Sequence, residues 1–328
     1  MCELFAMSSR FPADVHFSLE AFSRRGGLAG RNKDGWGLAY YVDQDVRLVK
    51  EPQPAGDSAC IRFIQDHPFT SAIVVSHIRR ATRGLVAMKN CQPFQRELGG
   101  CMHVFAHNGD LEPDSLRARM RLDAFHPVGE TDSEYAFCAL LDRLRAAWLR
   151  ERRPALAKRH DIVARFAVEL RALGPANFLY SDGDALFVHG HIRMHGDGRP
   201  PHTPGLHVLC RHCTPGARNV STEGLTVAME AQQEVVLAAS VPLTEEAGWL
   251  ALGEGELVVA QRGRIVSRTI TPSVAVAANS SARSTTWRAY PNPGGSSGPP
   301  ASGAKRRLPR TGKRRRPPRP WIPTTKSQ

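Results

Sequence analysis

Cys2 is the residue whose type and position most directly suggest chemistry in this chain. A small second residue generally permits removal of the initiator methionine, which would make Cys2 the N-terminal residue. A thiol and a free α-amine would then share one residue, and an α-amine titrates near pH ~8, so a nucleophile would stand beside a base. The alternative is a buried, unreactive cysteine that happens to follow the start codon.

A second segment offers hydrogen-bond donors to such a nucleophile. Asn108 and Gly109 follow an apolar stretch that we expect to form a strand. The Asn108 side-chain amide and the Gly109 N–H could converge on one oxyanion, since glycine lets the backbone approach closely. The alternative is that Asn-Gly marks a tight hairpin turn.

Two further segments carry charges that suit the two ends of an amino acid. Arg79 and Thr82 follow another predicted strand and could hold a carboxylate, or they could belong to an exposed basic loop. Asp132 lies in the first turn of a predicted helix, where it would hold an ammonium group, although the helix dipole alone also favours a carboxylate there. Together with the thiol and the oxyanion donors, these groups describe a γ-glutamyl substrate.

Short strands and a few helices would position these residues. Thr131 followed by Glu134 forms a capping-box pattern, and apolar residues at helical spacing come after it, so a helix starts there. A second helix is predicted over 155–173. Strands are predicted at residues 36–42, 46–49, 73–78, 103–106, 177–180, 185–188, 206–209, 234–239, 257–260 and 264–266. Many antiparallel-looking strands with few helices indicate layered sheets with helices outside.

The net charge of +13 belongs to the C-terminal end of the chain. Residues 283–328 hold 12 of the 44 Lys and Arg and no acid, which leaves 32 basic and 31 acidic residues upstream. We expect a globular domain over 2–272 and a disordered Pro/Ser/Arg-rich tail over 273–328, because the tail is too poor in apolar residues to fold. The run at 313–316 would bind polyanions weakly.

Cysteine usage and hydropathy indicate the compartment. Seven cysteines, an odd number at uneven spacing, suit a reducing cytoplasm better than a disulfide framework. No leader pattern and no window of ~18 apolar residues is present, so we expect a cytoplasmic protein without a membrane span. A His/Cys-rich stretch at 189–213 invites a zinc site. Cys210-Arg211-His212-Cys213 lacks a second paired motif, however, so no metal is predicted.

Several motifs together resemble the class II glutamine amidotransferases, which are Ntn hydrolases with an α+β, four-layer αββα sandwich of two antiparallel sheets. The motifs that carry this resemblance are Met1-Cys2-Glu3-Leu4, residues 77–82, 90–94, 107–109 and 129–134. Residues 33–37 and 181–183 make the chain most similar to the stand-alone, YafJ-like branch. The likeness covers about residues 2–270, with the motifs in the family's order.

The resemblance implies a catalytic centre made of three residues. Cys2 would be the nucleophile with its own α-amine as base, and Asn108 with Gly109 would form the oxyanion hole. The thiolate would attack the side-chain amide carbon of glutamine, expel ammonia and leave a γ-glutamyl thioester that water hydrolyses. The resemblance implies no metal and no organic cofactor.

The resemblance also implies the substrate contacts. Arg79 would bind the substrate α-carboxylate, Asp132 the α-ammonium, and Thr82 would be a further carboxylate contact. Arg80 stands where many synthase-linked members carry Trp, which affects how the pocket closes.

Three interpretations of function remain open at this point. The leading one is a glutaminase or amidotransferase that acts on glutamine, with a separate acceptor or synthase subunit as a possible recipient of the ammonia. The second is a hydrolase of γ-glutamyl amides or peptides, including glutathione-like substrates. The third is an inactive adaptor whose basic tail binds nucleic acid.

Overall fold

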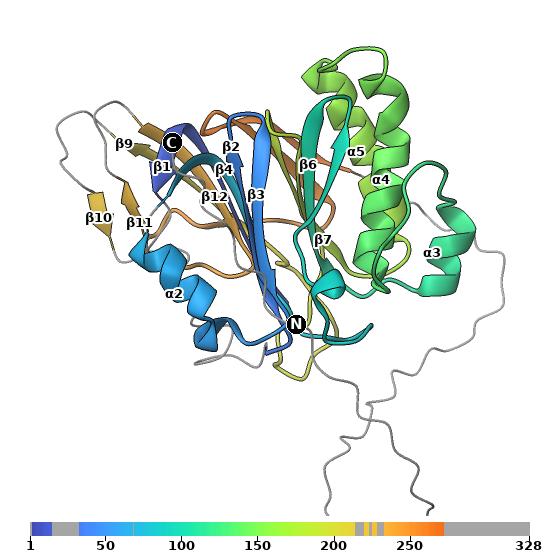
Figure 1. The fold of residues 1–328 in the computed structure, drawn as a ribbon, viewed down its shortest axis with the longest axis horizontal. Helices are drawn as coiled ribbons and strands as arrows, with labels where there is room; N and C mark the ends of the chain where they lie inside the picture. The colour runs from blue at the N-terminus through green and yellow to red at the C-terminus, as the bar shows by residue number, and fades with distance from the viewer. Residues whose placement is uncertain are drawn as a thin grey trace, which may run out of the picture. The chain divides into compact units, whose positions relative to one another are not determined.

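The computed structural model describes residues 2–14, 33–67, 69–213, 220–222, 225–227 and 233–271. The predicted tail at 273–328 lies outside these described residues. Within the described part, two antiparallel sheets form a sandwich, and helices cover the outer faces (Figure 1).

The seven-stranded sheet carries the N-terminal strand near its centre. Its strands in spatial order are β13 (Leu250–Ala251), β9 (His207–Cys213), β12 (Gln233–Ala239), β1 (Glu3–Asp14), β4 (Thr70–Ile78), β2 (Trp36–Val42) and β3 (Asp45–Glu51). Residues 4–9 of β1 are all buried, because β12 and β4 flank the strand and both sheet faces are covered. The sequence analysis predicted no strand here, since the buried Ser8 and Ser9 interrupt the apolar pattern.

The six-stranded sheet holds the segment that contains Asn108 and Gly109. Its strands in spatial order are β15 (Arg264–Ile270), β14 (Glu256–Gln261), β8 (Leu186–Gly190), β7 (Ala176–Ser181), β6 (Cys101–Gly109) and β5 (Phe94–Leu98). A separate hairpin joins β10 (Val220–Thr222) to β11 (Leu225–Val227). Strand β6 continues through Asn108 and Gly109, which pair with Asn177 and Ala176 of β7. The hairpin-turn alternative for Asn-Gly is therefore wrong.

Helices form the outer layers of the sandwich. Helices α4 (Asp132–Trp148) and α5 (Leu156–Arg171) pack on the six-stranded sheet, with α3 (Pro113–Arg119) beside α4, and α2 (Ala59–Asp66) packs on the other sheet. Short 3₁₀ turns occupy Ala55–Asp57 and Met88–Asn90. One apolar core lies between the sheets and one beneath each helical layer. This arrangement confirms the predicted αββα sandwich.

The start of α4 fixes the position of Asp132. The Thr131 hydroxyl accepts the Glu134 N–H at 3.2 Å, so the predicted cap is confirmed. The Glu134 carboxylate accepts the Gly129 N–H and pairs with Arg96, each at 2.6 Å. Glu134 therefore fixes the segment that leads into the helix. In a capping box, its carboxylate would instead accept the backbone N–H of Thr131.

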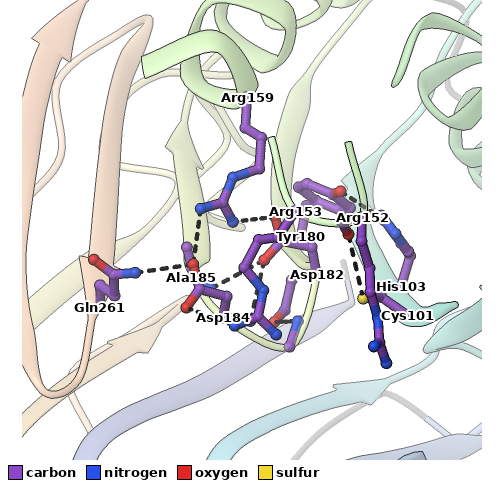
Figure 2. A network of polar contacts seen from close by, with 12 residues as sticks. Cys101, His103, Arg152, Arg153, Arg159, Tyr180, Asp182, Asp184, Ala185 and Gln261 are labelled. Atoms are coloured by element: carbon purple, nitrogen blue, oxygen red, sulfur yellow. Dashed lines mark hydrogen bonds and ion pairs between the residues drawn. The ribbon is translucent and has the colours of Figure 1, made fainter. Parts of the chain in front are cut away.

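A buried ion cluster lies at the end of the β6–β7 pair remote from Gly109 (Figure 2). Arg159 extends from α5 and donates to Asp182 and Asp184, which follow β7, at 2.7 Å each. Asp182 also accepts the backbone N–H groups of Asp184 and Ala185. The cluster ties α5 to the β7–β8 turn, which gives the motif at 181–183 a structural role.

Candidate active site

One pocket brings together the beginning of β1, the ends of β4 and β6, and the beginning of α4. Its non-protein space, open solvent included, is about 310 Å³. Its lining consists of Cys2, Arg79, Arg80, Thr82, Arg83, Gln92, His107, Gly109, Thr131, Asp132 and Ser133. Five of the six residues predicted from the sequence thus line a single pocket, and the sixth, Asn108, is hydrogen-bonded to Cys2.

The Cys2 thiol is partly exposed and lies against the backbone of Arg80. The Arg80 N–H donates to Sγ at 3.2 Å, and Sγ lies 3.4 Å from the Arg80 carbonyl oxygen. Burial raises the pKa of the Cys2 thiol, while the Arg80 N–H and the Arg79 charge oppose that rise. Reaction therefore requires a nearby base to take the thiol proton.

Asn108 is buried next to Cys2. Its Nδ2 donates to the Cys2 carbonyl oxygen at 2.6 Å, which leaves a second amide hydrogen for another acceptor. Its own backbone carbonyl accepts from Asn177 Nδ2 at 3.1 Å. A Cβ at Gly109 would lie 1.7 Å from the Pro175 carbonyl oxygen, so only glycine fits there. Pro175 and strand β7 thus fix the positions of Asn108 and Gly109.

Arg79 is buried, with 3% of its surface exposed, so the alternative of an exposed basic loop is wrong for this residue. Its guanidinium donates to four carbonyl oxygens, those of Arg83 at 2.9 Å, Leu85 at 3.2 Å, and Asp34 and Gly84 at 3.4 Å. These bonds fold the 80–85 loop over the pocket. Thr82, in the same loop, is exposed.

Asp132 presents a half-buried carboxylate at the N-terminus of α4. Oδ2 accepts the Leu111 N–H at 2.7 Å, and Oδ1 accepts the Ser133 N–H at 2.9 Å. Each oxygen keeps further acceptor capacity, and the helix N-terminus favours the negative charge. The carboxylate is therefore oriented by backbone donors and remains able to bind a cation.

His107 positions Asp132 through Ser133, a role that the sequence analysis did not predict. His107 Nε2 lies 3.2 Å from the Pro175 carbonyl oxygen, which can only accept, so Nε2 carries the proton. Burial lowers the pKa of His107, although Asp132 opposes the shift. Nδ1 of the neutral ring then accepts the Ser133 hydroxyl at 2.9 Å. The hydroxyl proton points away from Asp132, whose Oδ1 stays available.

Gln92, from the motif at 90–94, and Asp34, from the motif at 33–37, hold segments that line this pocket. The Gln92 side chain donates to the His107 carbonyl oxygen at 3.1 Å and accepts the His107 N–H at 2.7 Å. It therefore pairs with the His107 backbone as a residue of a neighbouring strand would. Asp34 accepts the Ala81 N–H at 2.7 Å, which fixes the loop after Arg79. These contacts join residues distant in sequence, and only the motifs themselves signalled their importance.

Within the described ranges, no three His, Cys, Asp or Glu side chains converge as a metal site. The side chains of His212 and Cys213 from the His/Cys-rich stretch lie outside the described residues. No helix in the described part of the chain has the length and apolar character required to span a membrane.

A family model for class II glutamine amidotransferases matches residues 1–284. The chain belongs to this family. YafJ of Escherichia coli, named a putative glutamine amidotransferase, is 36% identical over 261 residues that cover 78% of this chain and 96% of YafJ. The amidotransferase thus falls in the stand-alone, YafJ-like branch, as the motifs predicted.

Solved structures agree with this assignment. The crystal structure of a predicted glutamine amidotransferase from Pseudomonas aeruginosa is similar, with a TM-score of 0.58 and 31% identity, covering 81% of this chain and all of that one. The phosphoribosylpyrophosphate amidotransferase of Bacillus subtilis is 15% identical with a TM-score of 0.51, over 83% of this chain and 49% of that one. The latter likeness shows the Ntn-hydrolase-like fold alone.

Proposed function

We propose that this amidotransferase hydrolyses the side-chain amide of glutamine through a γ-glutamyl thioester on Cys2, releasing ammonia. After removal of Met1, the Cys2 α-amine takes the thiol proton, and Sγ bonds to the amide carbon. The oxygen of the tetrahedral intermediate accepts from Asn108 Nδ2 and the Gly109 N–H. The α-ammonium protonates the departing ammonia, the C–N bond breaks, and water deprotonated by the same amine then cleaves the thioester to glutamate.

The proposed substrate contacts follow from the charges around the thiol. The α-ammonium of glutamine binds Asp132, whose two oxygens are oriented by backbone donors. The α-carboxylate binds Arg79, and Thr82 borders the same pocket. Synthetic use of the ammonia would require a separate acceptor subunit.

The observation that carries the proposal is the meeting of the Cys2 thiol, the Gly109 N–H and the Asp132 carboxylate in one small pocket, with Asn108 bonded to Cys2. Those groups come from the residue before β1, the end of β6 and the start of α4, and Cys2 lies over a hundred residues before the other two in the chain. A nucleophile, oxyanion donors and an ammonium-binding carboxylate are the parts that amide hydrolysis of an amino acid needs.

Intact mass spectrometry with a glutamine-analogue alkylator tests the proposal. The purified protein should lack Met1 and take up one label, and ammonia should be released from glutamine. Cys2→Ala should abolish both labelling and ammonia release. Cys210→Ala is the matched control, since Cys210 is exposed and is not part of the pocket lining, and it should retain both. Active protein that retains Met1, or labelling that survives Cys2→Ala, would disprove this mechanism.

A further inference from the structure

A second, larger pocket adjoins the Cys2 pocket on the side of α3. Its non-protein space, open solvent included, is about 840 Å³, and it shares Arg83, Thr131 and Asp132 with the Cys2 pocket. We call it the α3 pocket. Neither Cys2, Arg79 nor Gly109 contributes to its lining. Asp132 therefore stands at the boundary between the two pockets, with the nucleophile on one side and the α3 pocket on the other.

This placement decides which end of a substrate faces the α3 pocket, given the proposed function. The γ-carbonyl lies at Cys2, the α-carboxylate at Arg79 and the α-nitrogen at Asp132. Only the last of these three residues borders the α3 pocket. A substituent on the α-nitrogen would therefore extend into this pocket, whereas a leaving group beyond the scissile bond would lie near Cys2.

The lining of the α3 pocket indicates what it would bind. Pro113, Leu116, Pro127 and the half-buried Tyr135 form an apolar wall. The two carboxylates in the lining differ, because Glu130 is held by Lys89 and Asn90, whereas Asp132 is held by neutral backbone N–H groups and keeps its charge for the substrate nitrogen.

The two arginines of the lining differ in whether they form an ion pair. Arg83 is paired with Asp110 at 2.6 Å. Arg117, on the exposed side of α3, makes no ion pair with any residue in the described part of the chain. The lining thus offers a ligand one cation that is unpaired among the described residues, Arg117, together with the apolar wall. An acidic group attached to an apolar or peptide stem would fit both features.

We propose that the enzyme also deamidates glutamine at the C-terminus of a peptide, where the α-nitrogen is acylated, and that Arg117 favours an acidic residue just before that glutamine. The free α-carboxylate still binds Arg79, and the peptide N–H donates to Asp132 in place of the ammonium group. One further residue spans about 3.5 Å of chain, which carries its side chain past Asp132. Cys2 forms the same thioester, ammonia leaves, water restores the thiol, and no peptide bond is broken.

Steady-state turnover of four substrates tests the inference: free glutamine, N-acetyl-Ala-Gln, N-acetyl-Glu-Gln and γ-glutamyl-alanine. Ammonia release and product mass would be recorded with the full chain. We expect both acetylated dipeptides to be converted to peptides ending in glutamate, with the higher kcat/KM for N-acetyl-Glu-Gln. Arg117→Ala should lower the ratio of the two kcat/KM values about two- to fivefold, the range of an exposed ion pair. The matched control Arg119→Ala, on the same helix but outside the pocket lining, should keep the ratio.

The outcomes separate this inference from the proposed function. Turnover of free glutamine without turnover of either acetylated dipeptide would overturn the inference and leave the proposed function intact. Absence of turnover with every substrate would count against both. An unchanged ratio in Arg117→Ala would overturn the role of Arg117. Arg117-dependent turnover of γ-glutamyl-alanine would place the α3 pocket on the leaving-group side and so contradict the inference.

Discussion

Arg79 and Arg159 are equally buried, each with 3% of its surface exposed, but their partners differ in charge. Arg159 donates to two carboxylates, those of Asp182 and Asp184. Arg79 donates to four neutral carbonyl oxygens, and no carboxylate of the described residues lies within ion-pair distance of it.

A buried charge is costly unless it is compensated, so the two arginines serve different purposes. The charge of Arg159 is neutralised inside the protein, and the resulting cluster joins a helix to a turn. The charge of Arg79 is only solvated by dipoles, which leaves it able to attract an anion from outside. The contrast supports the proposal that Arg79 attracts a carboxylate to the pocket through its uncompensated charge.

The strongest way to test this contrast is to break the compensated cluster. Asp182→Ala should lower the free energy of unfolding by about 3–5 kcal/mol, because it leaves Arg159 short of a buried counter-charge. Urea denaturation would measure the loss, and glutaminase activity per folded molecule should be unchanged. Adding Arg159→Met should restore part of the stability. A stability equal to that of the unmodified protein in Asp182→Ala would contradict the structural role of the cluster.

The Arg159 cluster also shows how far the sequence alone could lead. The predicted second helix is present as α5, and Arg159 occupies the same apolar stripe as Val163, Phe166 and Leu170. A charged residue in an apolar stripe signals a buried partner, so its burial could have been predicted. Its partner could not, since Asp182 reaches it only through the packing of α5 on the β7–β8 turn.

Similar limits apply around Cys2. Residue type and motif together predicted that four residues would share one site, namely Cys2, Asn108, Gly109 and Asp132. Strand β1 escaped prediction because Ser8 and Ser9 are buried by hydrogen bonds that no local pattern reveals. The chain from His107 through Ser133 to Asp132 depends on the register of β6 against α4, which is set by tertiary packing.

At the Cys2 end, the sharpest catalytic test is the Asn108 amide. Asn108→Ala should lower kcat for glutamine by about 10²–10³, the usual cost of removing one oxyanion donor. Alkylation of Cys2 by a small reagent such as iodoacetamide should persist, since it forms no oxyanion. An unchanged kcat would show that Asn108 is not an oxyanion donor and that its amide serves only to bind the Cys2 carbonyl oxygen.

Arg79 itself should behave as a ligand-binding charge. Arg79→Gln should raise KM for glutamine about 10- to 100-fold, since a charge-assisted hydrogen bond contributes about 1.5–3 kcal/mol. Added L-glutamate should raise the thermal midpoint of the unmodified protein and have little effect on Arg79→Gln. Arg159→Gln is the matched control, because its variant should be destabilised yet still respond to L-glutamate. Equal responses in all three proteins would contradict the comparison.

Two histidines of β6 extend the comparison to pH. His103 Nδ1 lies 2.8 Å from the Tyr180 hydroxyl near the Arg159 cluster, and burial lowers the pKa of His103 to about 4. Burial also lowers the pKa of His107 beside Asp132. Because an unfolded histidine titrates near 6.5, the unfolded chain binds more protons below that pH, so stability falls as pH decreases from 6.5 towards these lowered values.

Each of these two histidines should contribute about 1.4 kcal/mol per pH unit to that loss. Urea denaturation between pH 7.5 and 5 would give the slope, and His103→Asn should reduce it by this amount without changing KM for glutamine. His107→Asn should reduce the slope similarly but also raise KM, because the Ser133 hydroxyl would be freed to bond to Asp132. If both variants raised KM, the His103 and His107 ends of β6 would be coupled. The distinction between a structural role for His103 and a substrate-positioning role for His107 would then be wrong.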